Sequence, residues 1–447
     1  MTELADLTHA LLDAATRAGA DAADAMAVRS TSVSAQALRG ALEQAERAQS
    51  TEIGLRVLIG RRQSCVSASD LSPGTIEEIA ERAVAMARLA PEDPWVGLAD
   101  TTQLSNIRDA RSLELAEDAP EPEPEALLDR AIRAEAAALS HPGIAKADSA
   151  GASYGRDDIH IAATNGFSGG YARTSHATHC VAITGAGTKM ERDYYGDSRV
   201  FAADLDTPED IGRIAAERTI ARAGARKPPT GTFPVLYDER VASGLIGHLL
   251  DAANGAAVAR GSTWLRDRLG SQVLPAALSI TEDPHRPRVR GSKPFDAEGL
   301  RTAPRKIVEN GILTGWTLDL ATARKLGLQS TASAARGPGS PPSPSLTNIA
   351  LTQGTHTRDD LLRDMGRGLL VTSLIGSTIS ATTGDYSRGA SGFWIENGEI
   401  AYPVTELTIA GNLLDMLATI VPANDARPHL SRVVPSLLVE GLTIAGD

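Results

Sequence analysis

The sequence is poor in cysteine, in aromatic residues and in positive charge, and each shortage excludes a class of protein. Cys65 and Cys180 are its only cysteines, too few for a zinc framework and not suggestive of a secreted disulfide scaffold. Aromatic residues make up 4% of the chain, so the core must be built from Ala, Val, Leu and Ile. The formal net charge of −12 argues against tight nucleic-acid binding, because that affinity comes mostly from Lys and Arg neutralising phosphates.

Long apolar runs are also missing, and none approaches the length of a membrane span. The N-terminal stretch MTELADLTHALLDAATRAGADAADAM is acidic and amphipathic, without the basic and apolar regions of a signal peptide. A cytoplasmic location is therefore expected. The 447 residues are 42% hydrophobic and 22% charged, which is typical of a soluble globular protein of two or three domains.

The order helix, strands, helix is predicted twice in the first 225 or so residues. Apolar residues at helical spacing give way to period-two alternation and then to a second helix in a unit of about residues 1–95. After the acidic, proline-rich segment EDAPEPEPEA the same order returns over about residues 118–225, with a hairpin turn predicted at Asn165-Gly166. We interpret the pattern as a structural duplication within an N-terminal α+β region, residues 1–228.

Residues 229–447 read as a C-terminal β-rich domain, barrel-like or sandwich-like, with helices at 238–253 and about 357–368 inserted. Two hairpins are predicted at Asn310-Gly311 and Asn397-Gly398, because both residues of an Asn-Gly pair tolerate positive φ. The fold class is therefore α+β.

The segment ARGPGSPPSPSLTN, residues 335–348, is rich in glycine, proline and serine. It is either a flexible surface loop or a lid or strap over a cleft, and the sequence favours neither interpretation.

One histidine, His248, lies on the predicted helix 238–253. It borders a stripe of apolar residues at core spacing, so it should be partly buried or face a partner. A zinc peptidase helix needs two ligands close together and a glutamate that takes the proton of water. His248 is flanked by Gly247 and Leu249, and Asp251 is the nearest acid. A packed or interfacial histidine is therefore favoured over a metal ligand.

The stretch GDYSRGASGFWIENGEIAYPVTELTIAGNLLDML, residues 384–417, holds the densest set of candidate residues. We expect a glycine-rich loop that leads into a hairpin, with Asp385, Ser387 and Arg388 packed into the loop. One interpretation is a structural turn anchored by Trp394. The other is the wall of a peptide-binding groove, in which exposed backbone groups pair with an extended substrate. With His248, these four residues are the candidates for a peptide groove or an interface.

The same stretch resembles the C-terminal signature of the TldD/PmbA family, and specifically its PmbA (TldE) branch. LDLATARKLGLQSTASA, residues 318–334, is a second match, and IGLRVLIGRRQSCVSASDLSPGTIEEIAERAVAMA is similar to the family's N-terminal block. The resemblance spans nearly the whole chain. It implies that a TldD-type subunit, a zinc peptidase with an HExxxH helix and a later cysteine ligand, forms a heterodimer with a PmbA-type partner. The two enclose a chamber that degrades unfolded or small peptides and processes certain peptide precursors.

Laid on the HExxxH pattern, SGLIGH puts Ser243 at the first histidine, Gly244 at the glutamate and His248 at the second histidine. Val434 stands about where the cysteine ligand would fall. The resemblance therefore implies a subunit with no catalytic residue and no metal of its own, with the zinc in the partner. Such a subunit would complete the chamber, hold peptide and position the TldD-type chain, and a homodimer is expected when that partner is absent.

Two other functions stay open at this point. The chain could be an autonomous, metal-independent hydrolase that uses residues around Asp385, Ser387 and Arg388. The family's older label, modulator of DNA gyrase, suggests instead a regulatory binding protein with a protein target.

Overall fold

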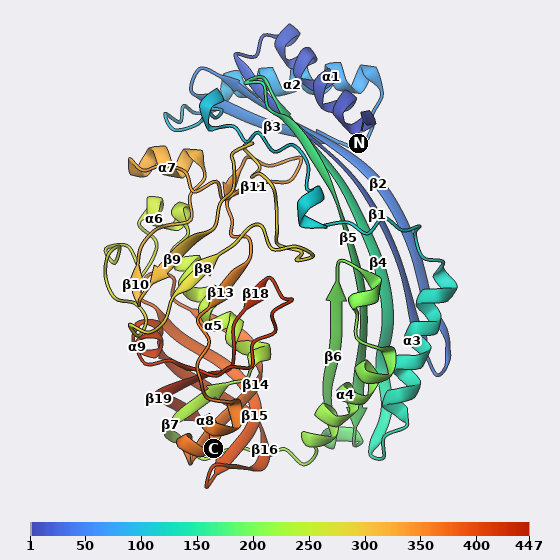
Figure 1. Ribbon diagram of the computed structural model, residues 1–447, viewed down its shortest axis with the longest axis vertical. Helices are drawn as coiled ribbons and strands as arrows, with labels where there is room; N and C mark the ends of the chain where they lie inside the picture. Colours follow the sequence, from blue (N-terminus) through green and yellow to red (C-terminus); the bar gives the residue numbers. More distant parts are fainter. Residues whose placement is uncertain (1, 447) are drawn as a thin grey trace.

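The computed structural model describes residues 2–446 and has α+β architecture, as the sequence predicts. An N-terminal six-stranded antiparallel sheet curves along one flank of the molecule, with helices on its outer side (Figure 1). The C-terminal domain, built around a closed β-barrel, lies beside the inner face of this sheet (Figure 1).

The N-terminal region consists of two copies of one unit, each a helix, three strands and a helix, so the predicted duplication is confirmed. The first unit comprises α1 (Thr2–Ala18), β1 (Ala22–Leu38), β2 (Ala41–Ile59), β3 (Arg62–Ala68) and α2 (Pro73–Leu89). The second comprises α3 (Pro124–Leu139), β4 (Ile144–Ala163), β5 (Ser168–Thr184), β6 (Glu191–Arg199) and α4 (Pro208–Ala221). Short 3₁₀ turns lie at Thr101–Gln103, Arg111–Leu113, Gly187–Lys189 and Ala202–Asp204.

The two units join through their long strands β1 and β4. These pair antiparallel from Asp24↔Ala163 to Ala37↔Ala150, which gives the sheet order β3-β2-β1-β4-β5-β6. This pairing links residues more than a hundred positions apart, so the two halves of the region share one sheet and one core.

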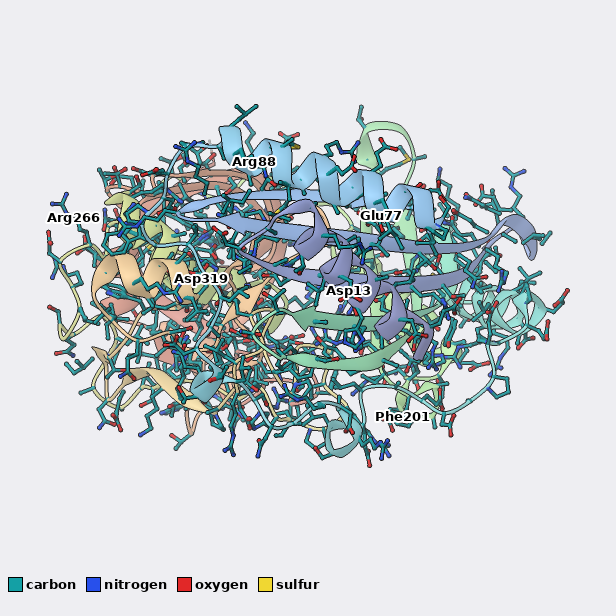
Figure 2. The ribbon with its side chains drawn as sticks, turned by 90° about the horizontal axis from the view of Figure 1, so that it is seen from above. Asp13, Glu77, Arg88, Phe201, Arg266 and Asp319 are labelled. Carbon is teal, nitrogen blue, oxygen red and sulfur yellow. The ribbon has the colours of Figure 1, made fainter. Side chains whose placement is uncertain are left out.

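All four helices cover the same face of the sheet. Alternate residues of β1 face one side, and Ala23 and Ala25 pack with α1 and α2 while Val33 and Ala35 pack near α3. Seen from above, α1 with Asp13 and α2 with Glu77 and Arg88 both lie across the sheet (Figure 2). The opposite face, with Met26 and Ile161, packs with Phe295 of the C-terminal domain.

The C-terminal domain is built on a barrel, which selects one of the two predicted alternatives. Its strands follow the order β16-β15-β14-β7-β19, and β16 also pairs with β19 at Thr408↔Ala445, so the ring closes. These strands are β7 (Gly231–Tyr237), β14 (Gly368–Ile379), β15 (Asp385–Glu396), β16 (Glu399–Asn412) and β19 (Leu437–Ala445). β17 (Val421–Pro422) pairs with β19.

A smaller sheet and several helices complete this domain. The sheet has the order β10-β9-β8-β13-β18. Its strands are β8 (Ile280–Glu282), β9 (Arg305–Glu309), β10 (Ile312–Leu313), β13 (Ile349–Leu351) and β18 (Arg432–Val433). The helices are α5 (Glu239–Ala252), α6 (Gly255–Arg260), α7 (Leu320–Leu326), α8 (Arg358–Met365) and α9 (Leu413–Ala418). The predicted helices are α5 and α8, and the sequence reasoning missed the shorter α6, α7 and α9.

Both predicted Asn-Gly hairpins form. Asn310 and Gly311 have φ of 50° and 80°, and Asn397 and Gly398 have φ of 54° and 78°. Positive φ at both central residues is the signature of a type I′ turn, whose twist matches that of the flanking strands.

The glycine- and proline-rich segment 335–348 crosses onto the N-terminal sheet. Its short strands β11 (Ala334–Ala335) and β12 (Ser343–Pro344) pair with each other. Arg336 forms an ion pair with Asp24 of β1, and a Cβ on Gly54 of β2 would overlap the carbonyl of Pro338. The segment is therefore a strap that ties the two regions together, rather than a free surface loop. No helix within residues 2–446 is long and apolar enough to cross a membrane.

Candidate functional site

Helix α5 carries the positions that the sequence comparison with HExxxH singles out. It begins after Asp238, whose carboxylate accepts a hydrogen bond from the Arg240 backbone N–H at 3.3 Å. The helix buries one face in the barrel core. The side chains of this buried face are Ala242, Leu245, Ile246, Leu249, Leu250 and Ala252. Ser243, Gly244 and His248 fall outside it and are only partly buried.

His248 is half-buried, as expected from its place beside the apolar stripe. Its ring meets the ring of Tyr386 edge-on, with centroids 6.0 Å apart. Burial lowers the pKa of His248 below its ordinary value; the carboxylate of Asp251 raises this pKa and the guanidinium of Arg388 lowers it. The imidazole is therefore held in its neutral form at neutral pH.

The other degenerate positions offer no ligand for a metal. Gly244 lies one turn before His248, and the space where its Cβ would stand is open. Val434 is 3% exposed and belongs to the core of the C-terminal domain. In the described part of the chain no group of three or more His, Cys, Asp or Glu side chains is placed to hold a metal ion. A zinc peptidase site needs three protein ligands, so these residues do not fit one.

A guanidinium that sequence reasoning missed lies against the middle of α5. A Cβ on Gly247 would stand 2.9 Å from Nη1 of Arg432, which is in β18. Arg388 approaches His248 from β15 and donates a 2.7 Å hydrogen bond from Nε to the carbonyl of Gly376. His248 therefore lies near two guanidiniums, those of Arg388 and Arg432, and one carboxylate, that of Asp251. Arg432 could not be found from local sequence, because β18 and α5 are almost two hundred residues apart.

The expected loop at 384–392 is instead the first part of strand β15, which corrects the sequence interpretation. From Asp385 to Ala390 the strand pairs regularly with β16, so its side chains alternate between two faces. Arg388 shares a face with Tyr386 and His248, whereas Asp385 and Ser387 point to the other face. The strand therefore separates the polar side chains that the sequence interpretation had grouped.

Asp385 has its own local partners on that other face. Its carboxylate accepts hydrogen bonds from Thr383 Oγ1 at 2.6 Å and Asn412 Nδ2 at 3.2 Å. These two bonds lower the pKa of Asp385, which is exposed. The group holds the turn between β14 and β15 and is not positioned as a base toward Ser387 or His248.

Trp394, for which the sequence left both a structural anchor and a groove wall open, is a core residue. Its side chain is fully buried and its ring meets Phe233 edge-on, with centroids 4.9 Å apart. Its Nε1 donates to Glu396 at 3.2 Å. The structural interpretation, an anchor for the hairpin, is the one that the packing supports.

Comparison with known proteins matches most of the chain to the domains of one family. Three consecutive family models match it: PmbA/TldA metallopeptidase domain 1 over residues 23–87, the central domain over 117–223 and the C-terminal domain over 230–446. This chain belongs to the PmbA/TldD metallopeptidase family. It is 38% identical to metalloprotease PmbA of Escherichia coli O157:H7 over 96% of this chain and 93% of that protein. It is 37% identical to the metalloprotease PmbA homolog of Haemophilus influenzae over 100% of this chain and 96% of that protein. These relatives assign it to the PmbA (TldE) branch.

Solved structures share the PmbA/TldD fold. A proposed modulator of DNA gyrase from Bacteroides thetaiotaomicron superposes with a TM-score of 0.91 over all of both chains, at 25% identity. TldE from Thermococcus kodakarensis, 20% identical, superposes with a TM-score of 0.86 over 98% of this chain and 100% of that chain. The curated relatives are named metalloproteases, yet among the α5 positions laid on HExxxH only His248 offers a metal ligand.

Proposed function

We propose that this chain is the metal-free subunit of a PmbA/TldD-type peptidase, and that it completes a peptide-holding chamber with a TldD-type subunit. That partner, with its HExxxH helix, would bring the zinc and the catalytic carboxylate. The proposal covers unfolded or small peptides as substrates, maturation of peptide precursors, a cytoplasmic location, and self-association when the partner is absent.

The observation that carries the proposal is the solitary imidazole on α5. Ser243 and Val434 stand where a histidine and a cysteine would bind zinc, and Gly244 stands where the glutamate would be. Of the three metal ligands that the resemblance implies, only His248 remains. Position 244, where the motif carboxylate would take a proton from water, is a glycine.

The test compares the chain alone, the partner alone and the two mixed. The partner is a TldD-type HExxxH protein from the same genome, and each sample is examined for bound zinc by elemental analysis and for cleavage of an unstructured peptide. We expect far less than one zinc per lone chain and cleavage only in the mixture. The mixture should keep its activity when His248→Ala is introduced, and lose it when the partner's motif glutamate is changed to glutamine. Stoichiometric zinc in the lone chain together with amide cleavage would overturn the proposal.

A further inference from the structure

A cavity of about 290 Å³ lies between the inner face of the N-terminal sheet and the C-terminal domain. It is partly open, and its size is near the lower end of small-molecule sites, roughly 300–1,000 Å³. One part of its wall is apolar or aromatic, from Met26, Ile159, Ile161, Phe295 and Leu346. The strap, residues 335–348, contributes another part of the wall.

The charged side chains of this wall do not balance. Within the described chain, the lining includes the cations Arg173, Lys293 and Arg336 and a single carboxylate, Asp296. Asp296 accepts hydrogen bonds from three backbone N–H groups, of its own loop and of β11, and its charge also acts on Lys293. These donors are Glu298 at 2.9 Å, Leu300 at 2.9 Å and Ala334 at 3.1 Å. The cavity is therefore cationic in a chain whose net charge is −12.

Several nitrogens of these cations lack hydrogen-bond partners. The Arg336 side chain is fully buried and pairs with Asp24, which also pairs with Arg56. Among residues 2–446, Nε and Nη2 of Arg336 and Nε of Arg173 are buried without a partner. Proteins rarely leave buried donors unpaired, because each costs roughly 1–3 kcal/mol.

Lys293 is a partly buried cation of this wall. Its Nζ donates a 3.2 Å hydrogen bond to the carbonyl of Ala334, which leaves ammonium protons free, and burial lowers its pKa. Nη2 of Arg173 donates to the carbonyl of Ser292 at 2.7 Å. An anion between these groups would satisfy donors that the protein itself leaves unsatisfied.

We propose that this cavity binds the C-terminal carboxylate of a short peptide whose last side chain is apolar. This inference rests on the proposed function, since it specifies how the peptide-holding subunit holds its peptide. The carboxylate would lie by Lys293 and Arg173, with Arg336 behind them, and the apolar side chain would lie against Met26, Ile161 and Phe295. A second cavity of about 170 Å³ is lined in part by Thr174 and Arg290, which are next in the chain to lining residues of the first.

The experiment is calorimetric titration of the full chain with N-acetyl-Ala-Ala-Leu and with the same peptide as its C-terminal amide. We expect the acid to bind about tenfold or more tightly than the amide, because the amide loses a charge-assisted interaction. Equal affinity of the two peptides, or no binding of the acid, would overturn the proposal. Inorganic phosphate is titrated as a third probe; phosphate binding without binding of the acid peptide would make the cavity a phosphate site and also overturn it.

Variants locate the binding. Lys293→Met keeps the length of the side chain and removes its ammonium group. The fold should survive because the nearby carboxylate of Asp296 keeps its three backbone donors, while affinity for the acid peptide should fall about tenfold and approach that of the amide. Lys325→Met, the same change on an exposed lysine of α7, is the matched control and should change nothing. Arg173→Gln should lower the affinity in the same way. An acid-specific affinity that both cavity variants leave intact would contradict the proposal.

The two proposals fail separately. If the mixture with the TldD-type partner cleaves peptide but the lone chain does not distinguish acid from amide, the cavity assignment fails and the proposed function stands. If the lone chain prefers the acid but the mixture is inactive, the proposed function fails.

Discussion

The α5 face of the barrel and the cavity at the strap differ in the charge of their buried groups. On α5, two of the three positions that bear the motif groups of an HExxxH helix hold Ser243 and Gly244, and the third, His248, is held neutral. Within residues 2–446, Arg336 at the cavity is fully buried with two nitrogens that have no partner, and Lys293 makes a single hydrogen bond. Neutral groups need no ligand, whereas unpaired buried donors are stabilised by one. The groups that a ligand would stabilise most therefore lie between the two regions, and not on the helix α5 that the family resemblance singles out.

The largest expected effect is at the strap side of this comparison. Asp24→Asn leaves two buried guanidiniums, those of Arg56 and Arg336, without a counter-charge. Removing one member of a buried ion pair costs about 3–5 kcal/mol, so the free energy of unfolding in urea should fall by that amount. Asp13→Asn, on the exposed side of α1 (Figure 2), is the matched control and should stay within about 0.5 kcal/mol. A small effect at Asp24 would mean that the buried charges are compensated in another way.

The corresponding change on the barrel side is Asp238→Asn at the start of α5. The Asp238 carboxylate caps the helix, accepts from Nε of Arg240 at 2.9 Å and lies 3.4 Å from Nη1 of Arg358. Arg240 keeps a second partner in Asp193 of β6, at 3.3 Å, so the loss should be smaller, about 2–3 kcal/mol. Urea unfolding measures it against Asp267→Asn, whose side chain is 90% exposed. A loss as large as that for Asp24→Asn would remove the distinction between the two regions.

The strap itself is tested by Gly54→Ala. The new methyl group would overlap the Pro338 carbonyl, so the strap must shift away from β2. Overpacking of this kind costs about 1–3 kcal/mol, and the shift moves Arg336 as well. We therefore expect both a lower melting temperature and weaker binding of the acid peptide, measured on the same preparation. Unchanged binding at lower stability would show that the strap does not shape the cavity.

The two regions should also differ in their response to acid. In the N-terminal region, burial lowers the pKa of His160 to about 4, and its Nδ1 lies 2.8 Å from Thr8 Oγ1. The unfolded chain takes up this proton near pH 6.5 and the folded chain only near pH 4, so stability falls as the pH drops through that window and His160 contributes no further loss below it. His160→Gln should flatten this part of the urea stability profile. His248→Gln should change the profile less, since a half-buried ring shifts less.

Local signals in the sequence predicted much of the fold, and long-range pairing accounts for what it missed. The Asn-Gly turns at 310 and 397 and the helix α5 follow from neighbouring residues. The strand 385–392 was misread as a loop because of its glycines. A Cβ on Gly392 would overlap the carbonyl of Leu370, so this glycine permits close strand packing and does not mark a flexible turn. Alternation alone could not tell which face of the strand is inside, which is why the sequence left both a structural anchor and a groove wall open for Trp394.

The cavity had no sequence signal at all, for the same reason. Arg173, Lys293 and Arg336 belong to three segments that are each unremarkable, and only the pairing of β1 with β4 and the path of the strap bring them together. The empty motif on α5 could be found from sequence because its members are adjacent. Because the motif positions are close together in sequence, sequence reasoning favoured the α5 face as a candidate site. The structure places the unpaired buried donors at the cavity instead.

The smallest expected effect is at Gly244, and its sign differs from that at Gly54. The space around a Cβ at position 244 is open, and alanine is more favourable than glycine within a helix by roughly 0.5–1 kcal/mol. Gly244→Ala should therefore stabilise the chain slightly, leave acid-peptide binding unchanged and keep the activity of the mixture with a TldD-type partner. Thermal melting, titration and the cleavage assay measure the three. If Gly244→Ala instead abolished cleavage in the mixture, the open space beside His248 would be a place that peptide or partner occupies. The α5 face would then be a functional site even though it lacks the metal ligands.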